Sequence, residues 1–374
     1  MKYILEYPIP ISNNEGRYYA LSACEKAKYI YSVLNRLGHK VEIISASYAK
    51  RCVHSRIDSI NESTVLISGA SLGWNNRFTK LVSRLSSMIW LLCFLLVRCK
   101  KGETILIYHG VQNIPIYIFA KWIKKFTYIL EVEEIYSMLG VSTFFNWRHR
   151  LEKLMIRYSD RYVFASKQLE SSCNIRQKPY VICTGAYIVP PRISSPLNDG
   201  KIHVVYAGLI ASGKVAFKSA QIGLYLNNDY HLHIIGYGCD NDINQLKDFI
   251  NSINKQTMCH ITYDGLKEGD EYVSFLQSCH IGLCPLTTSL HFQRACFPSK
   301  ITSYLSNGLL VLTTKNEVLE TSVYSDYLYF VNNDTPKEFA DMILNINTNM
   351  VNNPRQCIIS EDERVINEFT SILK

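Results

Sequence analysis

Paired cysteines are missing from this sequence: its 12 cysteines include no CxxC pair and follow no regular spacing. Scattered cysteines favour reduced thiols packed as small hydrophobic side chains over a disulfide framework. An acidic tail and low-complexity segments are also missing, and 47% hydrophobic with 19% charged residues indicates a globular protein. The first residues run directly into a strand-like segment without the features of a signal peptide. We therefore expect a cytoplasmic protein.

Two common phosphate-binding motifs are absent. The loop Gly208–Lys214 contains glycines and a lysine that could bind phosphate, but a P-loop requires a hydroxyl residue where this chain has Val215. Gly236–Asn241 lacks the last glycine of GxGxxG, so a nicotinamide cofactor is not expected. Asp240 and Asp242 resemble a metal-binding DxD pair, but their position before a helix favours a capping role over a metal site.

The order of strand-like and helix-like segments indicates an α/β protein with two domains. Strands and helices alternate through both halves, which favours parallel sheets with right-handed crossovers. A chain of 374 residues is long for one core, and Pro190–Gly200 is the clearest linker. We expect domains at 1–190 and 200–350, with a C-terminal helix in 351–374 that packs back toward the first domain. The predicted strands are Tyr3–Tyr7, Val41–Ser45, Val65–Ser68, Thr104–Tyr108, Tyr128–Leu130, Tyr162–Ala165, Tyr180–Cys183, His203–Ala207, His231–Ile235, His260–Tyr263, Gly282–Pro285, Leu309–Leu312 and Tyr327–Phe330.

Two segments of the first half combine basic residues with an apolar, tryptophan-bearing middle. Arg77–Lys101 surrounds the apolar run Met88–Val97, and Tyr117–Phe126 contains Trp122 and three lysines. Such helices can lie in a membrane interface, where anionic head groups attract the cations; buried core helices with solvated ends are the alternative. The run Met88–Val97 is too short to span a bilayer. The net charge of +8 also suggests an anionic partner.

Candidate site residues of the first half follow predicted strands. Gly16 lies in the loop after the first strand, His109 follows the strand that ends at 108, and Glu131, Glu133 and Glu134 form an acidic cluster. Ligands of parallel sheets bind at the carboxyl ends of strands, where a carboxylate can orient a hydroxyl or accept its proton. If the strand continues, Glu131 and Glu133 lie on one face and Glu134 on the other. Alternatively, Glu133 and Glu134 open the following helix, and His109 is a structural hydrogen-bonding residue.

The segment Phe297–Thr314 is the main candidate for a binding site in the second half. Pro298 suits the first helical turn, and Gly308 can end the helix in a left-handed conformation. A helix N-terminus that opens beside a sheet and carries Ser299 and Lys300 can bind phosphate, because free backbone N–H groups and the helix dipole favour anions. The alternative is an ordinary αβ unit with a solvated lysine.

The order of these second-half motifs resembles the donor domain of GT-B glycosyltransferases, especially the retaining family-4 type that builds bacterial surface polysaccharides. The matching segments are Val205–Gly208 with Gly213-Lys214, Ile234–Gly238, Ile261–Gly265, Ile281–Pro285 and Pro298–Gly308, the last of which resembles the family's P-x-K-x-x-E-Y-L-x-x-G. The resemblance covers about residues 200 to 330; the first half matches in its βα rhythm and its Gly16 loop. It implies two Rossmann-like domains facing a central cleft, the first binding the acceptor and the second the nucleotide sugar.

Carried over by position, the resemblance implies that Lys214 and Lys300 lie beside the donor diphosphate. The donor-binding residues implied or predicted are Gly16, Gly208, Gly213, Lys214, Gly236, Arg294, Pro298, Ser299, Lys300 and Ser303. The sequence departs from the family where its ribose-binding Glu falls at Ser303 and an earlier acidic residue falls at Ala295; the arginine of the Gly208 loop is also missing. A hydroxyl makes fewer and weaker hydrogen bonds to a ribose than a carboxylate. An unusual donor, a pocket rebuilt with Arg294 or lost activity would each account for this.

These expectations combine into a glycosyltransferase at the cytoplasmic face of a membrane. It would move a sugar from a nucleotide-diphosphate donor to a lipid-linked or saccharide acceptor in bacterial surface polysaccharide biosynthesis. Glu131, Glu133 or His109 would act at the acceptor, and no metal would be required. Retention of anomeric configuration is implied by the resemblance alone. The alternative is an inactive relative that acts as a saccharide-binding or assembly partner; a nucleic-acid binder is not favoured, because no recognition motif is present.

Overall fold

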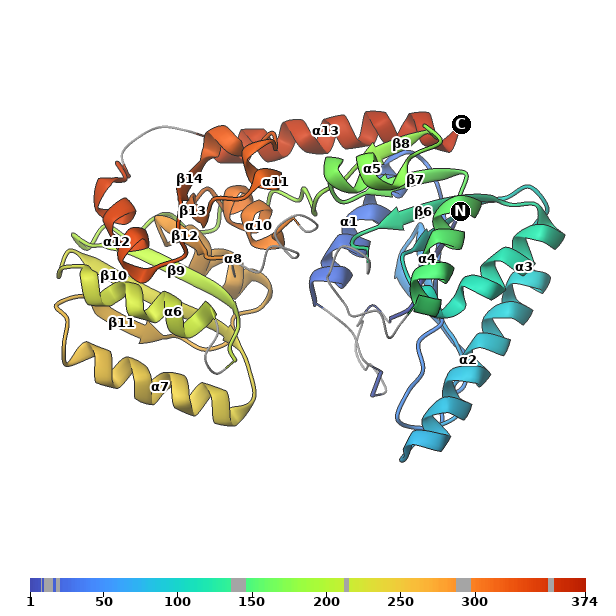
Figure 1. The fold of residues 1–374 in the computed structure, drawn as a ribbon, viewed down its shortest axis with the longest axis horizontal. Helices are drawn as coiled ribbons and strands as arrows, with labels where there is room; N and C mark the ends of the chain where they lie inside the picture. The colour runs from blue at the N-terminus through green and yellow to red at the C-terminus, as the bar shows by residue number, and fades with distance from the viewer. Residues whose placement is uncertain are drawn as a thin grey trace. The chain divides into compact units, whose positions relative to one another are not determined.

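The structure, a computed structural model, describes residues 1–7, 9, 16–17, 21–135, 146–211, 215–286, 297–348 and 353–374. It divides the chain into two compact units (Figure 1). Unit 1 consists of Met1–Ala186 and Glu363–Lys374, and unit 2 consists of Tyr187–Asp362. The predicted linker Pro190–Gly200 lies at the beginning of unit 2. Each predicted strand overlaps a strand of the structure.

Unit 1 is built on an eight-stranded sheet with the order β3-β4-β2-β1-β5-β6-β7-β8. Its strands are β1 (Lys2–Leu5), β2 (Val41–Ser45), β3 (Arg56–Asn61), β4 (Thr64–Ser68), β5 (Thr104–Tyr108), β6 (Thr127–Val132), β7 (Arg161–Phe164) and β8 (Tyr180–Ile182). Among these, β3 alone runs antiparallel, forming a hairpin with β4 at the sheet edge. The sequence reasoning did not predict this strand.

Helices cover both faces of this sheet. They are α1 (Leu21–Arg36), α2 (Arg77–Arg98), α3 (Ile114–Lys124), α4 (Asn146–Tyr158) and α5 (Lys167–Cys173), with a 3-10 turn η1 at Val111–Asn113. Buried residues of α2, α3, α4 and α5 pack with alternate residues of the strands into one core. On the other face, Lys26 of α1 reaches the end of β6. Strands such as β1 and β5 are accordingly buried along most of their length, because successive strand residues face the two helix layers.

Unit 2 is a parallel sheet with the order β11-β10-β9-β12-β13-β14. Its strands are β9 (Ile202–Leu209), β10 (Tyr230–Tyr237), β11 (His260–Tyr263), β12 (Ile281–Cys284), β13 (Leu310–Thr314) and β14 (Leu328–Val331). Its helices are α6 (Val215–Ile222), α7 (Asp240–Asn254), α8 (Gly269–Gln277), α10 (Ser299–Asn307), α11 (Glu317–Glu320) and α12 (Pro336–Asn345), with 3-10 turns η3 (Gly223–Tyr225) and η4 (Ser325–Tyr327). Helices α6, α7 and α12 bury apolar residues on one face, and α10 packs with α8.

The last helix, α13 (Pro354–Leu373), begins in unit 2 and ends in unit 1. Within unit 1, the Arg364 guanidinium donates to the Ile182 carbonyl oxygen at 2.9 Å, and Arg161 donates to the carbonyl oxygen of Ile372. Phe369 and Ile372 on the same helix are fully buried. The end of the chain is therefore an integral part of unit 1.

Candidate functional site

A buried tyrosine fixes helix α10 on the sheet of unit 2. The Tyr304 hydroxyl accepts a hydrogen bond from the Ala207 backbone N–H at 2.9 Å and donates to the Leu283 carbonyl oxygen at 3.3 Å. Its ring lies directly on Gly282, where an added Cβ would come within 2.5 Å of the ring. These contacts tie α10 to β9 and β12. They place its N-terminus beside the carboxyl ends of these strands, the usual ligand-binding edge of a parallel sheet.

The predicted residues Gly208, Gly236 and Lys300 lie together at this edge. A Cβ added at Gly208 would stand 2.6 Å from the Lys300 ammonium nitrogen, and one added at Gly236 would stand 1.8 Å from the Gly208 carbonyl oxygen. Gly236 also has a φ of +141°, a conformation that L-residues rarely adopt. Gly236 is therefore required sterically, because its Cβ would meet backbone, whereas a Cβ at Gly208 would displace the end of the Lys300 side chain.

Lys300 has no carboxylate partner among the residues that the structure describes. Its ammonium nitrogen lies 4.1 Å from the centre of the Tyr206 ring, a cation–π contact. In the described parts of the chain, no Asp or Glu lies within ion-pair distance of it. Tyr206 is almost fully buried, so the ring holds the half-buried lysine at the strand ends. The lysine is thus positioned but not neutralised.

The first turn of α10 adds backbone donors to this charge. Pro298 occupies the N-cap position and provides no side-chain hydrogen bond to the turn. The N–H groups at the start of a helix have no intrahelical acceptor, and the helix dipole is positive there. Ser299, the exposed first residue of the helix, brings a hydroxyl to the same place. Lys300 and the helix N-terminus thus bring a positive charge and hydrogen-bond donors to one place, the chemistry that a phosphate requires.

Ser303, which falls where the resemblance expects a carboxylate, already has a partner. Its hydroxyl lies 3.1 Å from the hydroxyl of Tyr272 on α8. The pair joins α10 to α8 below the helix N-terminus. Three other predicted donor-binding residues, Gly213, Lys214 and Arg294, lie outside the described residues, as does Ala295.

The aspartates that were predicted to cap a helix do not occupy its cap. The N-cap of α7 is Cys239, whose sulfur accepts a hydrogen bond from the Asp242 N–H at 3.4 Å. Asp240 is the first residue of the helix instead. Both carboxylates still lie in the first turn, where negative charge is favoured by the helix dipole.

In unit 1, Glu131 lies near the end of β6 and Glu133 directly after it, and both carboxyl groups interact with Lys26. Glu131 is fully buried and accepts a hydrogen bond from the Tyr3 hydroxyl at 2.5 Å. Burial, reinforced by the charge of Glu133, raises the pKa of Glu131 to about 8. A carboxyl with no exposed surface does not face a ligand, so Glu131 can act only through its neighbours.

Glu133 is partly exposed and is held by a buried lysine. The Lys26 ammonium group lies 2.6 Å from a Glu133 carboxylate oxygen, and it also donates to the carbonyl oxygen of Cys183. The lysine side chain is 7% exposed and the glutamate side chain 24%. This ion pair orients the Glu133 carboxylate at the carboxyl end of β6. Among the predicted acidic residues, Glu133 is therefore better placed than Glu131 to contact an acceptor.

His109 lies on the opposite face and is a structural residue. Its Nε2 is 3.1 Å from a carboxylate oxygen of Glu152 on α4, and both side chains are nearly buried. Burial raises the pKa of the neighbouring Glu134, partly offset by His109. This arrangement matches the alternative interpretation of His109 as an internal hydrogen-bonding residue. The structure separates it from Glu131 and Glu133.

Gly16 stands apart from these residues, with a φ of +73° and an exposed position. The carbonyl oxygen of Gly16 accepts a hydrogen bond from the Lys50 N–H at 3.4 Å. The next residue, Arg17, is buried and donates to the carbonyl oxygens of Ser47 and Gly69. The Gly16 turn is thus anchored through Arg17 to the ends of β2 and β4.

The sequence reasoning missed a polar pocket beside the end of β1. A cavity of about 30 Å³, large enough for a water molecule, is lined by Glu6, Arg84, Ser87 and Asn113 among others. The Asn113 amide donates to the Glu6 carboxylate at 3.2 Å, and burial raises the pKa of Glu6 to about 7. In the sequence, the one signal for this pocket is the position of Glu6 directly after a strand. The other residues that line the pocket come from distant segments, so the sequence does not show that they meet.

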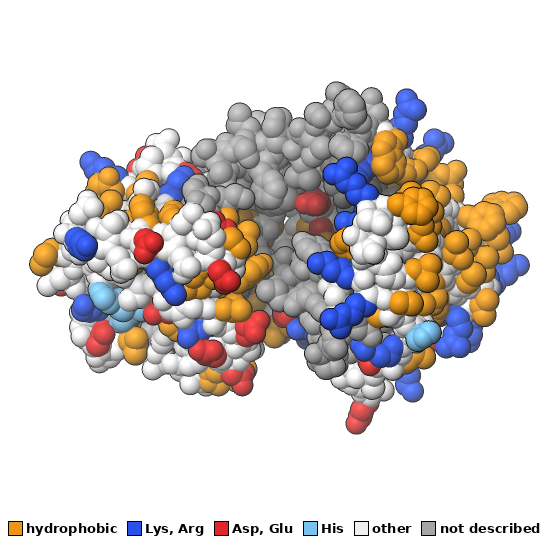
Figure 2. Space-filling model, turned by 90° about the horizontal axis from the view of Figure 1, so that it is seen from below, with side chains coloured by type: hydrophobic (Ala, Val, Ile, Leu, Met, Phe, Trp, Pro, Cys, Tyr) orange, Lys and Arg blue, Asp and Glu red, His pale blue; other side chains and the backbone are white. Residues whose placement is uncertain are grey.

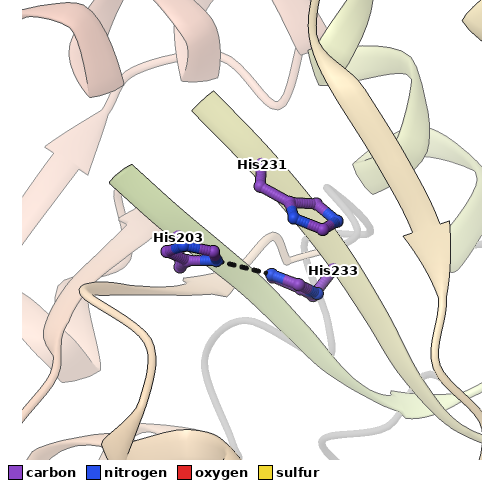
Figure 3. A group of neighbouring side chains, drawn as sticks. All are labelled: His203, His231 and His233. Carbon is purple, nitrogen blue, oxygen red and sulfur yellow. Dashed lines mark hydrogen bonds between the residues drawn. The ribbon is translucent and has the colours of Figure 1, made fainter. Parts of the chain in front are cut away.

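A histidine cluster in the amino-terminal halves of strands β9 and β10 could offer three ring nitrogens to a metal. His203, His231 and His233 each have a nitrogen within 4.8 Å of the others (Figure 3). His203 Nδ1 and His233 Nε2 are hydrogen-bonded at 2.9 Å, and the outer nitrogens of these two rings meet Asp199 and Asp264. The rings of His231 and His233 stack with centres 3.8 Å apart, so their in-plane lone pairs do not converge on one point. This arrangement is that of a hydrogen-bonded network.

Comparison with known proteins gives a clear result for the fold. No protein-family model matches the chain, and no curated protein matches it. The sucrose-phosphate synthase from Thermosynechococcus elongatus matches with a TM-score of 0.73 and 12% identity, over 99% of this chain and 97% of that chain. HepE of Anabaena in complex with UDP and glucose matches with a TM-score of 0.68 and 8% identity, over 100% and 98% of the two chains.

The fold is GT-B. A further match is the E. coli structure described as trehalose-6-phosphate bound with UDP-2-fluoro glucose, with a TM-score of 0.64 and 8% identity over 100% and 98% of the chains. The GT-B fold with two Rossmann-like parallel-sheet domains, predicted from the sequence, is thereby confirmed. At these identities the comparison establishes the fold, while the function must be argued from the residues of the site.

Proposed function

We propose that this chain is a glycosyltransferase that uses a nucleotide-diphosphate sugar as its donor. The observation that carries the proposal is the candidate anion site of unit 2: Lys300, without a carboxylate partner among the described residues, stands at the N-terminus of α10 over Gly208. A diphosphate supplies the negative charge and the oxygen acceptors that such a site requires. The GT-B structures that match the chain over nearly its full length include complexes with UDP and with a UDP sugar, which supports a nucleotide-sugar donor.

The site would promote reaction by stabilising the leaving nucleoside diphosphate. When the bond between the sugar and the diphosphate breaks, negative charge grows on the departing oxygen atoms. Lys300 and the N–H groups of the first α10 turn are already fixed in place, so they need little reorganisation to meet this charge. We propose that this pair, together with Lys214, takes the role that a metal would otherwise have. The retaining stereochemistry is implied by the family resemblance.

We assign acceptor binding to unit 1 and the positioning of the acceptor hydroxyl to Glu133. The Lys26–Glu133 pair fixes the carboxylate at a strand end, and a fixed carboxylate can accept the hydrogen bond of a hydroxyl. Glu131 would act as a positioning residue behind it, through the shared electrostatic environment.

We propose a lipid-linked or saccharide acceptor in bacterial surface polysaccharide biosynthesis, and action at the cytoplasmic face of the membrane. Support comes from the resemblance to the family-4 type. It also comes from the basic and apolar helices α2 and α3, which lie on the surface of unit 1.

One observation favours a second candidate, a non-catalytic relative that binds saccharides. The family's ribose-binding carboxylate is replaced by Ser303, and the Ser303 hydroxyl is already paired with Tyr272. Such a protein would keep the fold without binding a nucleotide.

Calorimetry with a panel of UDP, GDP and dTDP sugars separates the two candidates. We expect one nucleotide class to bind, and we expect a Lys300→Met variant to bind it at least roughly tenfold more weakly, because a hydrogen bond to a charged group is lost. Lys315→Met serves as the matched control, since Lys315 is an exposed lysine of the same unit that pairs with Glu320. Mass spectrometry of products formed with the bound donor then identifies the transfer. Absence of binding to every donor would support the saccharide-binding relative instead.

A further inference from the structure

Helices α3 and α4 border an open apolar groove on unit 1. The groove has a volume of about 890 Å³ and is lined by Ile118, Phe119 and Trp122 of α3 and by Leu151, Leu154 and Tyr158 of α4, among others. Trp122 is 75% exposed, Phe119 47% and Leu154 38%. A soluble monomer rarely leaves an apolar surface of this kind uncovered. The groove is therefore suited to an apolar partner.

The exposed apolar surface continues on α2, which packs beside α3. Phe78, Ile89 and Val97 of α2 are each more than 60% exposed. Figure 2 shows apolar side chains gathered over one side of unit 1, with Lys and Arg side chains around them. A single docking face is thus formed by α2, α3 and α4.

The charge of this face is predominantly positive, and the acidic residue that lines the groove, Asp160, is paired with Lys121 at 2.5 Å. Helix α2 carries four Lys or Arg residues, α3 two and α4 four, whereas neither α2 nor α3 contains Asp or Glu. The one acidic residue of α4, Glu152, is buried against His109. Arg150, Lys153 and Arg157 of α4 are exposed. A partner that covers the face must combine apolar groups with negative charge, which is the chemistry of an anionic lipid surface.

The topology indicates that α2 lies along such a surface. Arg77–Arg98 is the one helix of the described residues that is long and apolar enough to cross a membrane, in contrast to the shorter run considered in the sequence. However, α2 connects β4 and β5 of the same sheet, and its Ser83, Ser87, Leu91 and Leu95 form a buried stripe at four-residue spacing. To span a bilayer, the helix would have to leave the core of unit 1. The side away from this stripe carries the exposed residues Phe78, Leu81, Leu85, Ile89 and Val97, which are available for interfacial contact.

We propose that the face formed by α2, α3 and α4 docks on an anionic lipid bilayer and that the α3–α4 groove takes a hydrocarbon chain of a bilayer lipid. Cations around the groove meet the head groups, while Trp122 and Phe119 enter the acyl boundary. The inference rests on the proposed function in one respect: it deepens the assignment of a lipid-linked acceptor by giving the acceptor's membrane a docking face. Vesicle binding itself can be measured independently of catalysis.

Co-sedimentation of the full chain with vesicles tests the docking. We expect binding to vesicles of phosphatidylcholine with phosphatidylglycerol, weaker binding to phosphatidylcholine alone, and a decrease with salt. A variant with Arg150→Glu, Lys153→Glu and Arg157→Glu should lose at least about tenfold in affinity, since each basic residue contributes to attraction by the surface. The control variant, Lys247→Glu with Lys255→Glu on the exposed surface of unit 2, should bind as the unaltered chain does. Equal affinity in all three proteins would overturn the charge argument.

Fluorescence tests the groove. Phosphatidylcholine brominated on its acyl chains should quench tryptophan emission in vesicle-bound protein, and Trp122→Phe should remove most of that quenching. Phe119→Asp with Trp122→Asp should abolish vesicle binding, whereas Ile175→Asp, at a residue that is 86% exposed elsewhere on unit 1, should not. All these side chains are exposed, so the variants should have nearly the melting temperature of the unaltered protein. Measuring it checks that each variant is folded. Quenching that persists in Trp122→Phe, or a dimer in solution without vesicle binding, would overturn the proposal.

Calorimetry with the nucleotide-sugar panel on the same proteins separates the two claims. Donor binding without vesicle binding would refute the docking face and leave the glycosyltransferase proposal standing. Vesicle binding without donor binding would support the docking face and refute the glycosyltransferase proposal.

Discussion

Replacement of Lys300 by methionine is the most informative single change. Methionine keeps an apolar stem against Tyr206 and Gly208 but removes the charge. The ammonium group has no carboxylate partner among the described residues, so its loss leaves no uncompensated acid. The cation–π contact contributes about 0.5–1 kcal/mol to stability, which corresponds to a fall in melting temperature of about 2–4 °C at most.

The effect on catalysis should be far larger than the effect on stability. A hydrogen bond to a charged group is worth about 1.5–3 kcal/mol, which corresponds to a fall of roughly 10- to 150-fold in kcat/KM. Release of nucleoside diphosphate from the donor, followed with a coupled assay, measures this directly. Lys315→Met, on the exposed surface of the same unit, should retain full activity. If Lys300→Met keeps the kcat/KM of the unaltered protein, the reasoning that places the diphosphate at α10 is refuted.

Further predictions concern the glycines, the anchor of α10 and a buried acid. Gly208→Ala should fold but bind donor roughly tenfold more weakly by calorimetry, because the new Cβ displaces the flexible end of Lys300. Gly236→Ala should lower the free energy of unfolding, measured by chemical denaturation, by about 3 kcal/mol or more, because its Cβ meets backbone. Unaltered donor affinity in the first or unaltered stability in the second would contradict the packing. Tyr304→Phe should cost about 1–3 kcal/mol in the same measurement, since a buried N–H loses its acceptor; an unchanged midpoint would show that water replaces the hydroxyl. Because the folded protein raises the pKa of Glu131 from 4.5 to about 8, it binds the proton more tightly than the unfolded chain, and stability should fall as the pH rises through that interval. Glu131→Gln should flatten this decline in melting temperature, and an unchanged slope would contradict the assignment.

The strands of the two sheets could be predicted from the sequence, because buried parallel strands are short, continuous apolar runs that are easily recognised. The segments 104–108 and 281–284 are examples. Strand β3 escaped prediction, since Arg56–Asn61 has only two apolar residues and alternates between exposed and half-buried positions at a sheet edge. Its pairing with β4 is decided by contacts that local sequence does not encode.

The residues of the candidate anion site could be predicted where a residue type has few structural roles, as a lysine or a glycine has at the end of a strand or the start of a helix. A lysine after Pro298 and glycines at two strand ends pointed to an anion site, and the structure brings them together. By contrast, the anchoring role of Tyr304 and the ring beneath Lys300 depend on the packing of α10 across β9 and β12, between residues about a hundred positions apart. Glu131 and Glu133 could be predicted as acidic residues at the end of a strand. Their division into a buried and an exposed carboxylate depends on Tyr3 and Lys26, which the fold supplies from distant segments.

Hydrogen–deuterium exchange with and without the bound nucleotide sugar tests the central claim most directly. The N–H groups of Ser299 and Lys300 at the start of α10 have no intrahelical acceptor, so a diphosphate held there should slow exchange in a peptide that covers both residues. We predict this protection in the unaltered protein and its loss in Lys300→Met at the same donor concentration. Donor binding that leaves exchange at this helix end unchanged would contradict the account.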